Sequence, residues 1–231
     1  MQQIPLGWRW PAQQRFDTFH IADNGVAAQA IEQAALQTGA PWVFLHGAEG
    51  SGKTHLLIAA CHAATDAGAS AQYVALRNLA EPRATVLRGF GGSDLLVLDD
   101  VDALAGSADL QHALFDLFNR CRAEGSTLVF SGPAPATQLG FDLPDLVSRL
   151  SSCTQVLLNP LNDEQRREVL RARGEARGVV LGDAVLDFLF QRYARDLGSL
   201  GILLDRLDRE SLAAKRRVTV PFLRELLSRE M

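Results

Sequence analysis

The chain has 231 residues, of which 47% are hydrophobic and 22% charged, and its formal net charge at pH 7 is −4. This is the composition of an ordinary globular protein with room for one sizeable core or two modest ones. A net negative charge argues against a protein whose main partner is a nucleic-acid backbone, because such affinity comes from clustered positive charge. We therefore expect any link to DNA to be indirect.

Membrane and secretory features are not evident in the sequence. No apolar run approaches the roughly 20 residues of a membrane-spanning helix, and residues 1–10 lack the charged-then-apolar order of a signal peptide. We expect a cytoplasmic protein without membrane contact. Cys61, Cys121 and Cys153 are too few and too scattered for a disulfide framework or a metal site, so they predict packed or half-buried thiols.

After an irregular tail over 1–14, the chain alternates between helical spacing and short apolar runs. Strands that alternate with helices imply parallel βαβ units with helices on both faces of the sheet. In chain order we expect a helix over 24–38 capped by Asn24, strands over 42–45, 71–76, 95–98 and 127–130, and helices over 54–67 and 110–121.

The alternation stops near residue 160. Four amphipathic helical patterns follow, over 163–177, 183–194, 199–215 and 220–229. The sequence therefore predicts three parts: the tail (1–14), an α/β core (15–159) and a small all-α domain (160–231).

A phosphate-binding loop is predicted between the first strand and the helix behind it. Its glycines let backbone N–H groups turn inward around phosphate oxygens, Lys53 reaches the β and γ oxygens, and Thr54 ligates magnesium. A chance Gly-rich turn is the alternative, but Lys53 is one of only two lysines in the chain. The segment GAEGSGKT fits G-x-x-x-x-G-K-[ST] at every position, with Gly47, Gly50, Gly52, Lys53 and Thr54 as the matching residues.

Two acidic residues end the apolar run at 95–98. Asp99 and Asp100 would lie at the carboxyl edge of the sheet, where open α/β folds bind ligands. We expect Asp99 to hold the magnesium shell together with Thr54, and Asp100 to polarise a water. The alternative is an acidic turn that only starts a helix, and the predicted phosphate loop argues against it.

From residue 3 to its end, the chain resembles the DnaA branch of AAA+ ATPases, and within it the Hda family of regulatory inactivators of the initiator DnaA. The resemblance implies an AAA+ P-loop core followed by a helical lid. It also implies that the protein binds ADP or ATP with magnesium. It leaves open which nucleotide is resident and whether the free protein is a homo-oligomer. The segments that carry the resemblance most specifically are RFDTF at 15–19, GKTHLL at 52–57, LDDV at 98–101 and LPDLVSRL at 143–150.

The resemblance also assigns roles to single residues. It implies that Phe16, with the residues up to Asn24, lines the adenine side, and that His55 belongs to the nucleotide-binding set. It implies that Arg149 is an arginine finger that acts on nucleotide held by a neighbouring subunit, and that Arg195 is the sensor-2 arginine of the lid. Surface ion pairs are the alternative for both arginines.

The chain departs from the family pattern at two places. Pro133 stands at the polar sensor-1 position, and proline cannot hydrogen-bond a γ-phosphate, so we expect at most weak intrinsic ATPase activity. The sequence ends at Met231, directly after the lid, where DnaA continues into a DNA-binding domain. An ATPase core of an initiator without its DNA-reading domain suggests a regulator.

A short peptide near the N-terminus resembles the Q-L-x-L-x-[LF] peptide that docks on the replicative sliding clamp, the beta subunit of DNA polymerase III. Gln3 would donate hydrogen bonds, while Ile4, Leu6 and Trp8 would fill an apolar groove. A tail that packs on its own core is the alternative.

The resulting hypothesis is a nucleotide-bound adaptor that docks on the clamp and stimulates ATP hydrolysis by DnaA, which would inhibit initiation of DNA replication. Two alternatives stay open: a self-sufficient AAA+ ATPase or helicase loader, and an assembly factor that recruits a partner to the initiator.

Overall fold

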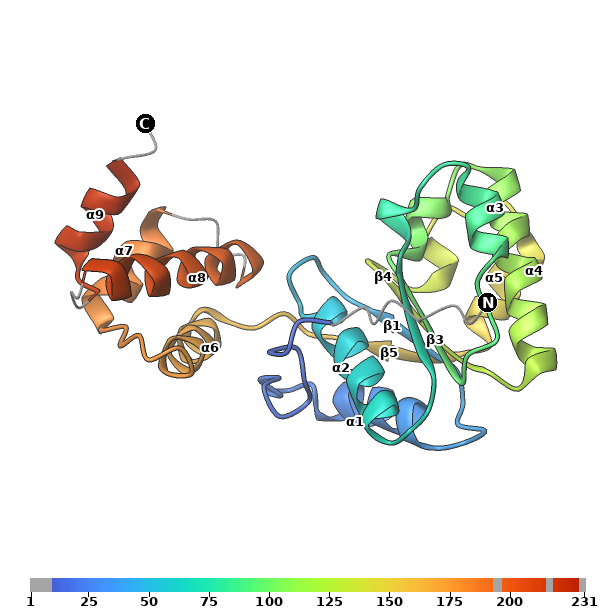
Figure 1. Ribbon diagram of the computed structural model, residues 1–231. Helices are drawn as coiled ribbons and strands as arrows, with labels where there is room; N and C mark the ends of the chain where they lie inside the picture. The colour runs from blue at the N-terminus through green and yellow to red at the C-terminus, as the bar shows by residue number, and fades with distance from the viewer. Residues whose placement is uncertain (1–9, 193–196, 215–217, 229–231) are drawn as a thin grey trace, which may run out of the picture. The chain divides into compact units, whose positions relative to one another are not determined.

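The computed structural model describes residues 10–192, 197–214 and 218–228. The chain forms two compact units, residues 1–160 and 161–231, and each is described by itself below. The first unit is drawn from blue to yellow in Figure 1 and the second in orange and red. The helices and strands of the first unit are α1 (Gly25–Leu36), β1 (Val43–His46), α2 (Lys53–Asp66), β2 (Ala71–Ala75), α3 (Arg83–Arg88), β3 (Leu95–Asp99), α4 (Ala108–Glu124), β4 (Thr127–Gly132), α5 (Pro144–Ser151) and β5 (Thr154–Leu157).

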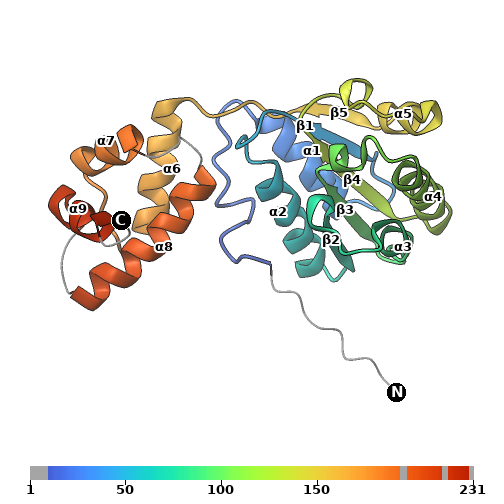
Figure 2. The same ribbon diagram turned by 90° about the horizontal axis from the view of Figure 1, so that it is seen from above.

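The first unit is a three-layer sandwich around a parallel sheet. The five strands of the described residues lie in the order β2-β3-β4-β1-β5, and every neighbouring pair is parallel. Helices α1 and α2 cover one face, and α3, α4 and α5 cover the other (Figure 2). The α/β fold class predicted from the sequence is confirmed.

Both faces of the sheet are apolar because both are covered. In β3, Leu95 and Val97 pack toward α1 and α2, while Leu96 and Leu98 pack toward α3, α4 and α5. This explains why the central strands read as continuous apolar runs, since alternation is lost when neither face meets water. Cys61, Cys121 and Cys153 are free and buried in these layers, and burial raises the pKa of the Cys61 thiol to about 12.

The second unit is entirely helical in its described residues. It contains α6 (Asp163–Glu175), α7 (Asp183–Arg192), α8 (Leu197–Ala214) and α9 (Val220–Ser228). Their apolar sides meet in one core that includes Leu170, Leu186 and Leu223. A reciprocal capping box starts α6: the side chain of Asn162 accepts from the backbone N–H of Gln165, and the side chain of Gln165 accepts from that of Asn162.

Three elements were not predicted: α3, α5 and β5. The first two are short helices of 6 and 8 residues, and β5 is an edge strand in which only Val156 is buried. An edge strand with a single buried residue gives neither an apolar run nor a clear alternation. Their apolar residues become recognisable as core only beside the neighbouring elements.

The predicted cap of the first helix is wrong in its chemistry. Asn24 occupies the N-cap position of α1, but its side chain makes no capping hydrogen bond. It is buried, with 2% of its surface exposed. Its amide donates to the carbonyl oxygen of Asn159 at 3.0 Å and accepts from the N–H of Asn159 at 2.8 Å. Asn24 thus joins the start of α1 to the chain that leaves β5.

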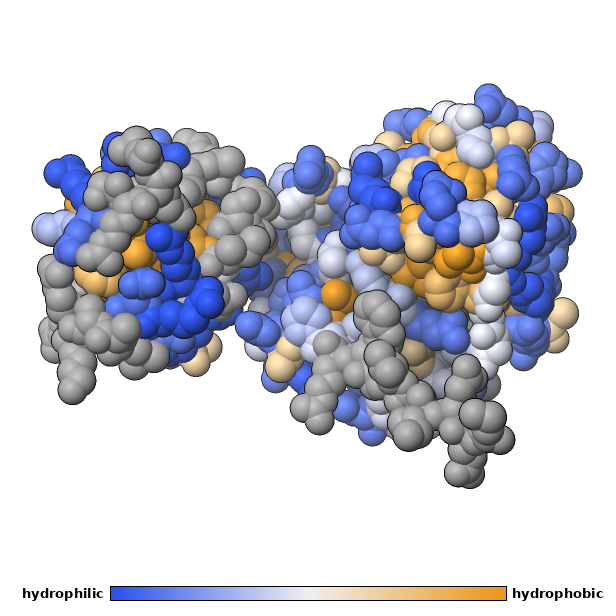
Figure 3. Space-filling view, turned by 45° about the horizontal axis from the view of Figure 1, so that its top comes forward, coloured by the Kyte–Doolittle hydropathy of each residue, from blue (hydrophilic) through white to orange (hydrophobic). Residues whose placement is uncertain are grey.

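The surface drawn in Figure 3 is largely hydrophilic on each unit, with hydrophobic side chains between the charged ones. No helix in the described part of the chain is both long and apolar enough to cross a membrane.

Candidate nucleotide-binding site

The predicted phosphate loop lies between the strand β1 and the helix α2. Gly50 and Gly52 adopt positive φ angles of 74° and 101°, which residues with a Cβ rarely adopt. Gly47 is required for a different reason: a Cβ there would lie 2.3 Å from the carbonyl oxygen of Leu158. The loop therefore holds its shape through glycine, and it ends at the positively polarised N-terminus of a 14-residue helix.

Lys53 is the first residue of α2, directly after this loop. Its ammonium donates to the carbonyl oxygens of Gly47 at 2.8 Å and Ala48 at 3.0 Å. Burial lowers the pKa of Lys53, and the carboxylates of Asp100 and Asp99 oppose that effect. The ammonium is therefore a half-buried cation at the start of α2.

Asp99 is the centre of the polar network at the carboxyl edge of the sheet. Only 2% of its surface is exposed. The hydroxyls of Thr54 and Tyr73 each donate to Oδ2 at 2.7 Å, and the hydroxyl of Ser131 donates to Oδ1. Ser131 can do this because it lies near the C-terminal end of β4, which lies between β1 and β3. The structure thus brings together Thr54 and Asp99, the two residues predicted to hold magnesium.

Asp100 lies at the turn after β3 and makes a different set of contacts. Its backbone is left-handed, with a φ of 59°, and its N–H donates to the hydroxyl of Ser131 at 3.0 Å. Its carboxylate accepts from Nε of Arg77 at 2.9 Å, and the same guanidinium bonds Asp102 at 2.6 Å. Burial and the neighbouring Asp99 raise the pKa of Asp100, whereas Arg77 lowers it.

The segment before α1 packs against the phosphate loop. The ring of Phe19 would lie 3.1 Å from a Cβ at Gly52, and it meets the ring of His55 edge-on at 5.4 Å. The Nε2 atom of His55 lies 2.9 Å from the carbonyl oxygen of Arg15. Phe16 packs on the core beneath α1 and α2. The segment that the resemblance assigns to the adenine side thus lies against the phosphate loop and the start of α2.

Pro133 directly follows β4 and is exposed. Its ring nitrogen carries no hydrogen, so it donates no hydrogen bond to a ligand at this edge. Ser131, two residues earlier, is the buried polar residue of this strand end.

The other predicted residues lie elsewhere. Arg149 lies in the last turn of α5 and is half-buried, with its guanidinium 5.8 Å from the centre of the Phe118 ring. Among the described residues, no carboxylate forms an ion pair with it. Arg195 and the peptide residues Gln3, Ile4, Leu6 and Trp8 lie outside the described residues, so their roles stay predictions.

Three contributors to this site were not predicted: Tyr73, Arg77 and Ser131. Tyr73 lies in β2, Arg77 follows β2 and Ser131 lies near the end of β4, and both strands neighbour β3, so the parallel order of the sheet was the signal that could have found them. Without the strand order, a tyrosine and a serine in apolar runs are ordinary core residues.

The side chains fit a bound nucleotide and magnesium. The hydroxyl of Ser51 is buried inside the loop without a hydrogen-bond partner, which is the state of a group that awaits a ligand. A hydroxyl and a carboxylate, Thr54 and Asp99, are oxygen ligands of the kind that Mg²⁺ prefers.

Comparisons with known proteins show which families and solved structures this chain is similar to. The family profile described as bacterial DnaA ATPase domain matches residues 12–157, and the profile described as Hda, lid domain matches residues 163–227. Domain III of the replication initiation protein DnaA from Thermotoga maritima superimposes with a TM-score of 0.77 at 23% identity, over 92% of this chain and 95% of that one.

Two further structures share the fold. A replication initiator DnaA bound to AMPPCP and single-stranded DNA gives a TM-score of 0.70 at 22% identity, over 89% of this chain and 68% of the other. The Thermotoga maritima RuvB Holliday junction branch migration motor gives 0.60 at 16% identity, over 93% and 73%. The chain belongs to the bacterial DnaA ATPase-domain family, in the DnaA branch of AAA+ proteins, and carries a lid of the Hda type.

Proposed function

We propose that this protein binds ADP or ATP with magnesium at the edge formed by the phosphate loop and β3. Lys53 and the N–H groups of the loop would hold the phosphates, Thr54 and Asp99 would hold the magnesium shell, and Phe16 and Phe19 would flank the base. Magnesium would supply charge neutralisation between phosphate oxygens. The bare Ser51 hydroxyl and the glycine-dependent loop support this proposal.

The nucleotide that is hydrolysed belongs, in our proposal, to a partner. The protein would dock on the sliding clamp through Gln3, Ile4, Leu6 and Trp8, and would insert Arg149 at the nucleotide of DnaA. Stimulated hydrolysis by DnaA would then inhibit initiation of replication. The observation that carries this proposal is Arg149: a half-buried arginine beside an aromatic ring, with no carboxylate paired to it among the described residues.

Two features of this chain's own site favour a partner's nucleotide as the substrate. Pro133 offers no hydrogen bond at the sensor-1 position, and the carboxylate of Asp100 is engaged by Arg77. Both features would slow hydrolysis in cis. They weigh against a self-sufficient ATPase or helicase loader.

Single-turnover hydrolysis of ATP preloaded on DnaA, with clamp loaded on DNA, tests the proposal. Wild type should accelerate the reaction, and Arg149→Ala should lose the acceleration while it retains nucleotide and clamp binding. An arginine supplied in trans is worth roughly 10³ to 10⁵ in rate where it has been measured.

Two matched variants complete this experiment. Arg88→Ala removes an exposed arginine of the same unit that pairs with Asp109 at 2.7 Å, and it should stimulate like wild type. Asp100→Asn should matter much less than Arg149→Ala. An Arg149→Ala protein that stimulates fully would overturn the finger assignment, and an equal loss in Asp100→Asn would favour a motor.

A further inference from the structure

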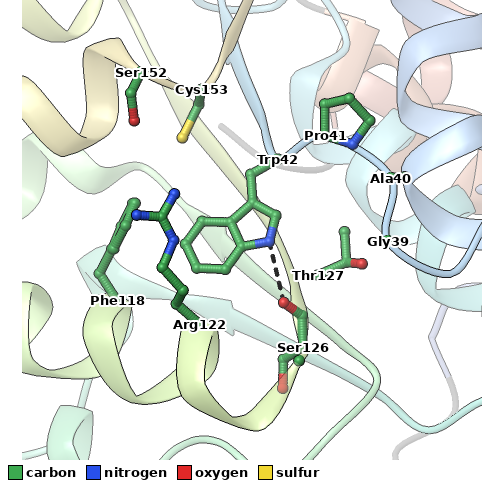
Figure 4. Close-up of a pocket in the computed structure, with 11 residues that line it drawn as sticks. Gly39, Ala40, Pro41, Trp42, Phe118, Arg122, Ser126, Thr127, Ser152 and Cys153 are labelled. Atoms are coloured by element: carbon green, nitrogen blue, oxygen red, sulfur yellow. Dashed lines mark hydrogen bonds between the residues drawn. The ribbon is translucent and has the colours of Figure 1, made fainter.

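A pocket opens at the edge of the sheet opposite the nucleotide site. It encloses about 370 Å³ at the amino ends of β1 and β4 and the C-terminal end of α4. Figure 4 shows Arg122 between the rings of Phe118 and Trp42, with its guanidinium directed toward Ser152 and Cys153. Arg122 is the charged residue of this lining.

Arg122 is held over an aromatic floor. Its guanidinium carbon lies 5.7 Å from the centre of the Trp42 ring and 5.6 Å from that of Phe118. The side chain is exposed, and no described carboxylate pairs with it. A cation–π contact of this kind uses no N–H donor, so the N–H groups of the guanidinium stay available to a planar acceptor.

Both rings of this floor are held by further contacts. The indole N–H of Trp42 donates to the carbonyl oxygen of Ser126 at 3.1 Å, and its ring meets Phe118 edge-on at 4.5 Å. Phe118 has 1% of its surface exposed and stacks on Phe130 in the core. Arg122 thus contacts two rings that are themselves anchored in the first unit.

This pocket lies beside the end of α5, the helix that carries Arg149. The guanidiniums of Arg122 and Arg149 lie 5.6 Å and 5.8 Å from the centre of the same ring, that of Phe118. Ser152 and Cys153, which line the pocket, directly follow α5, the helix of Arg149. Two cations without carboxylate partners among the described residues therefore share one face of the first unit.

We propose that the Arg122 pocket receives an Asp or Glu side chain of the same partner protein whose nucleotide Arg149 reaches. The inference rests on the proposed function and extends it: Arg149 would act on phosphate, whereas Arg122 would fix the docking of the two proteins.

A carboxylate side chain suits the pocket better than other anions do. A volume of about 370 Å³ is at the small end for ligand sites, which run from about 300 to 1,000 Å³, and it accommodates one or two side chains. One guanidinium edge matches one carboxylate in a bidentate pair. A polyphosphate would call for several cations, and Arg122 is the cation that lines the pocket.

The experiment measures docking and turnover separately. Binding of full-length variants to immobilised ATP-loaded DnaA is titrated, and single-turnover hydrolysis is followed over the same concentrations. Arg122→Glu should raise the half-saturating concentration about tenfold, as expected for a reversed charge at an interface, while the rate at saturation stays that of wild type. Arg149→Ala should give the opposite pattern, with lost rate and near-normal binding.

Two controls exclude simpler effects. Arg88→Glu makes the same charge change at an exposed arginine of α3 and should leave the half-saturating concentration unchanged. Arg122→Lys keeps the charge that α4 favours in its last turn but loses the fork geometry, so it should bind with intermediate strength.

Several results would overturn the inference. Unchanged binding of Arg122→Glu, with or without a lower melting temperature, would reduce Arg122 to a helix-end residue. If Arg122→Glu lowers the rate at saturation and leaves binding unchanged, Arg122 acts at the nucleotide. If Arg122→Glu loses self-association in sedimentation velocity, the occupant of the pocket is a second copy of this chain. If wild type binds DnaA without stimulating it, the proposed function fails, while weaker binding by Arg122→Glu still supports the pocket.

Discussion

At the scale of single residues, one buried carboxylate organises the candidate nucleotide site. Asp99 accepts from the hydroxyls of Thr54, Tyr73 and Ser131, which belong to three different elements. Its charge is thus distributed over neutral donors and remains able to attract a cation. The cations nearby have other partners: Lys53 donates to the loop carbonyls, and Arg77 to Asp100 and Asp102.

Lys53→Ala should weaken the binding of ADP or ATP. The substitution leaves phosphate oxygens without a half-buried counter-charge, a loss of about 2 to 4 kcal/mol if a charge-assisted hydrogen bond is worth roughly 1.5 to 3 and desolvation adds to it. Isothermal titration calorimetry checks this. Lys215→Ala, which removes the only other lysine, is the matched control, and equal affinities of the two variants would refute the phosphate site.

Arg77→Ala should raise the basal rate of ATP hydrolysis, because it releases the Asp100 carboxylate that would polarise water. The side chain of Arg77 is 55% exposed, so the free energy of unfolding should change by less than about 1 kcal/mol. Arg77 lowers the pKa of Asp100, and its removal therefore raises that pKa. The acid limb of the pH profile of hydrolysis should move to higher pH.

Arg77→Lys is the control for this prediction, since it keeps a positive charge beside Asp100. Its basal rate and its pH profile should lie nearer those of wild type. An Arg77→Ala protein with the basal rate and the acid limb of wild type would show that the ion pair does not restrain Asp100.

At the scale of elements, short polar contacts join segments that are far apart in the chain. The Asn24 side chain pairs with the backbone of Asn159, which ties the start of α1 to the end of β5. The Gln111 side chain of α4 accepts from the N–H groups of Asp142 and Leu143, at the entry to α5. These contacts determine where α1 and α5 lie against the sheet.

Asn24→Ala should lower the free energy of unfolding by about 1 to 3 kcal/mol, because it removes the two hydrogen bonds between the buried Asn24 side chain and the backbone of Asn159, each worth roughly 0.5 to 1.5 kcal/mol. Urea denaturation checks this. Asn24→Asp keeps only the acceptor and should fall in between. Gln33→Ala, on the exposed side of α1, is the control, and a loss in Asn24→Ala no larger than in this variant would contradict the prediction.

At the scale of the whole molecule, the chain combines a DnaA-type ATPase core, an Hda-type lid and an N-terminal segment. Each of the two units has its own apolar core. The N-terminal segment is the part in which we place clamp docking, and its described end, at Trp10, contacts His62 of α2 with ring centres 5.5 Å apart.

Deletion of residues 1–8, or replacement of Gln3, Leu6 and Trp8 by alanine, should abolish clamp binding and leave the melting temperature almost unchanged. A short peptide that enters a groove of its partner contributes little to the core of its own protein. Pull-down with clamp and thermal unfolding check both parts. Trp10→Ala is the aromatic control: it should retain clamp binding and lose some stability. Clamp binding that survives the deletion would return the segment to the status of a packed tail.

The sequence alone was sufficient for features that depend on local pattern. The phosphate loop is a contiguous motif whose glycines are required by backbone geometry, and the apolar runs at 43–45 and 95–98 are long enough to mark covered strands. The parallel α/β core and the helices of the lid were therefore predictable. Arg195 and the clamp peptide stay predictions from resemblance.

Only the tertiary structure decided which residues meet across elements. The strand order places β4 between β1 and β3, so that Ser131 bonds Asp99, and it gives Arg77 the carboxylate of Asp100 as a partner. The side chain of Asn24 is buried and does not cap α1; it bonds the backbone of Asn159, just after β5. These outcomes depend on contacts between residues more than twenty positions apart in the chain. Local sequence does not predict such contacts, because tertiary packing determines them and local propensity does not.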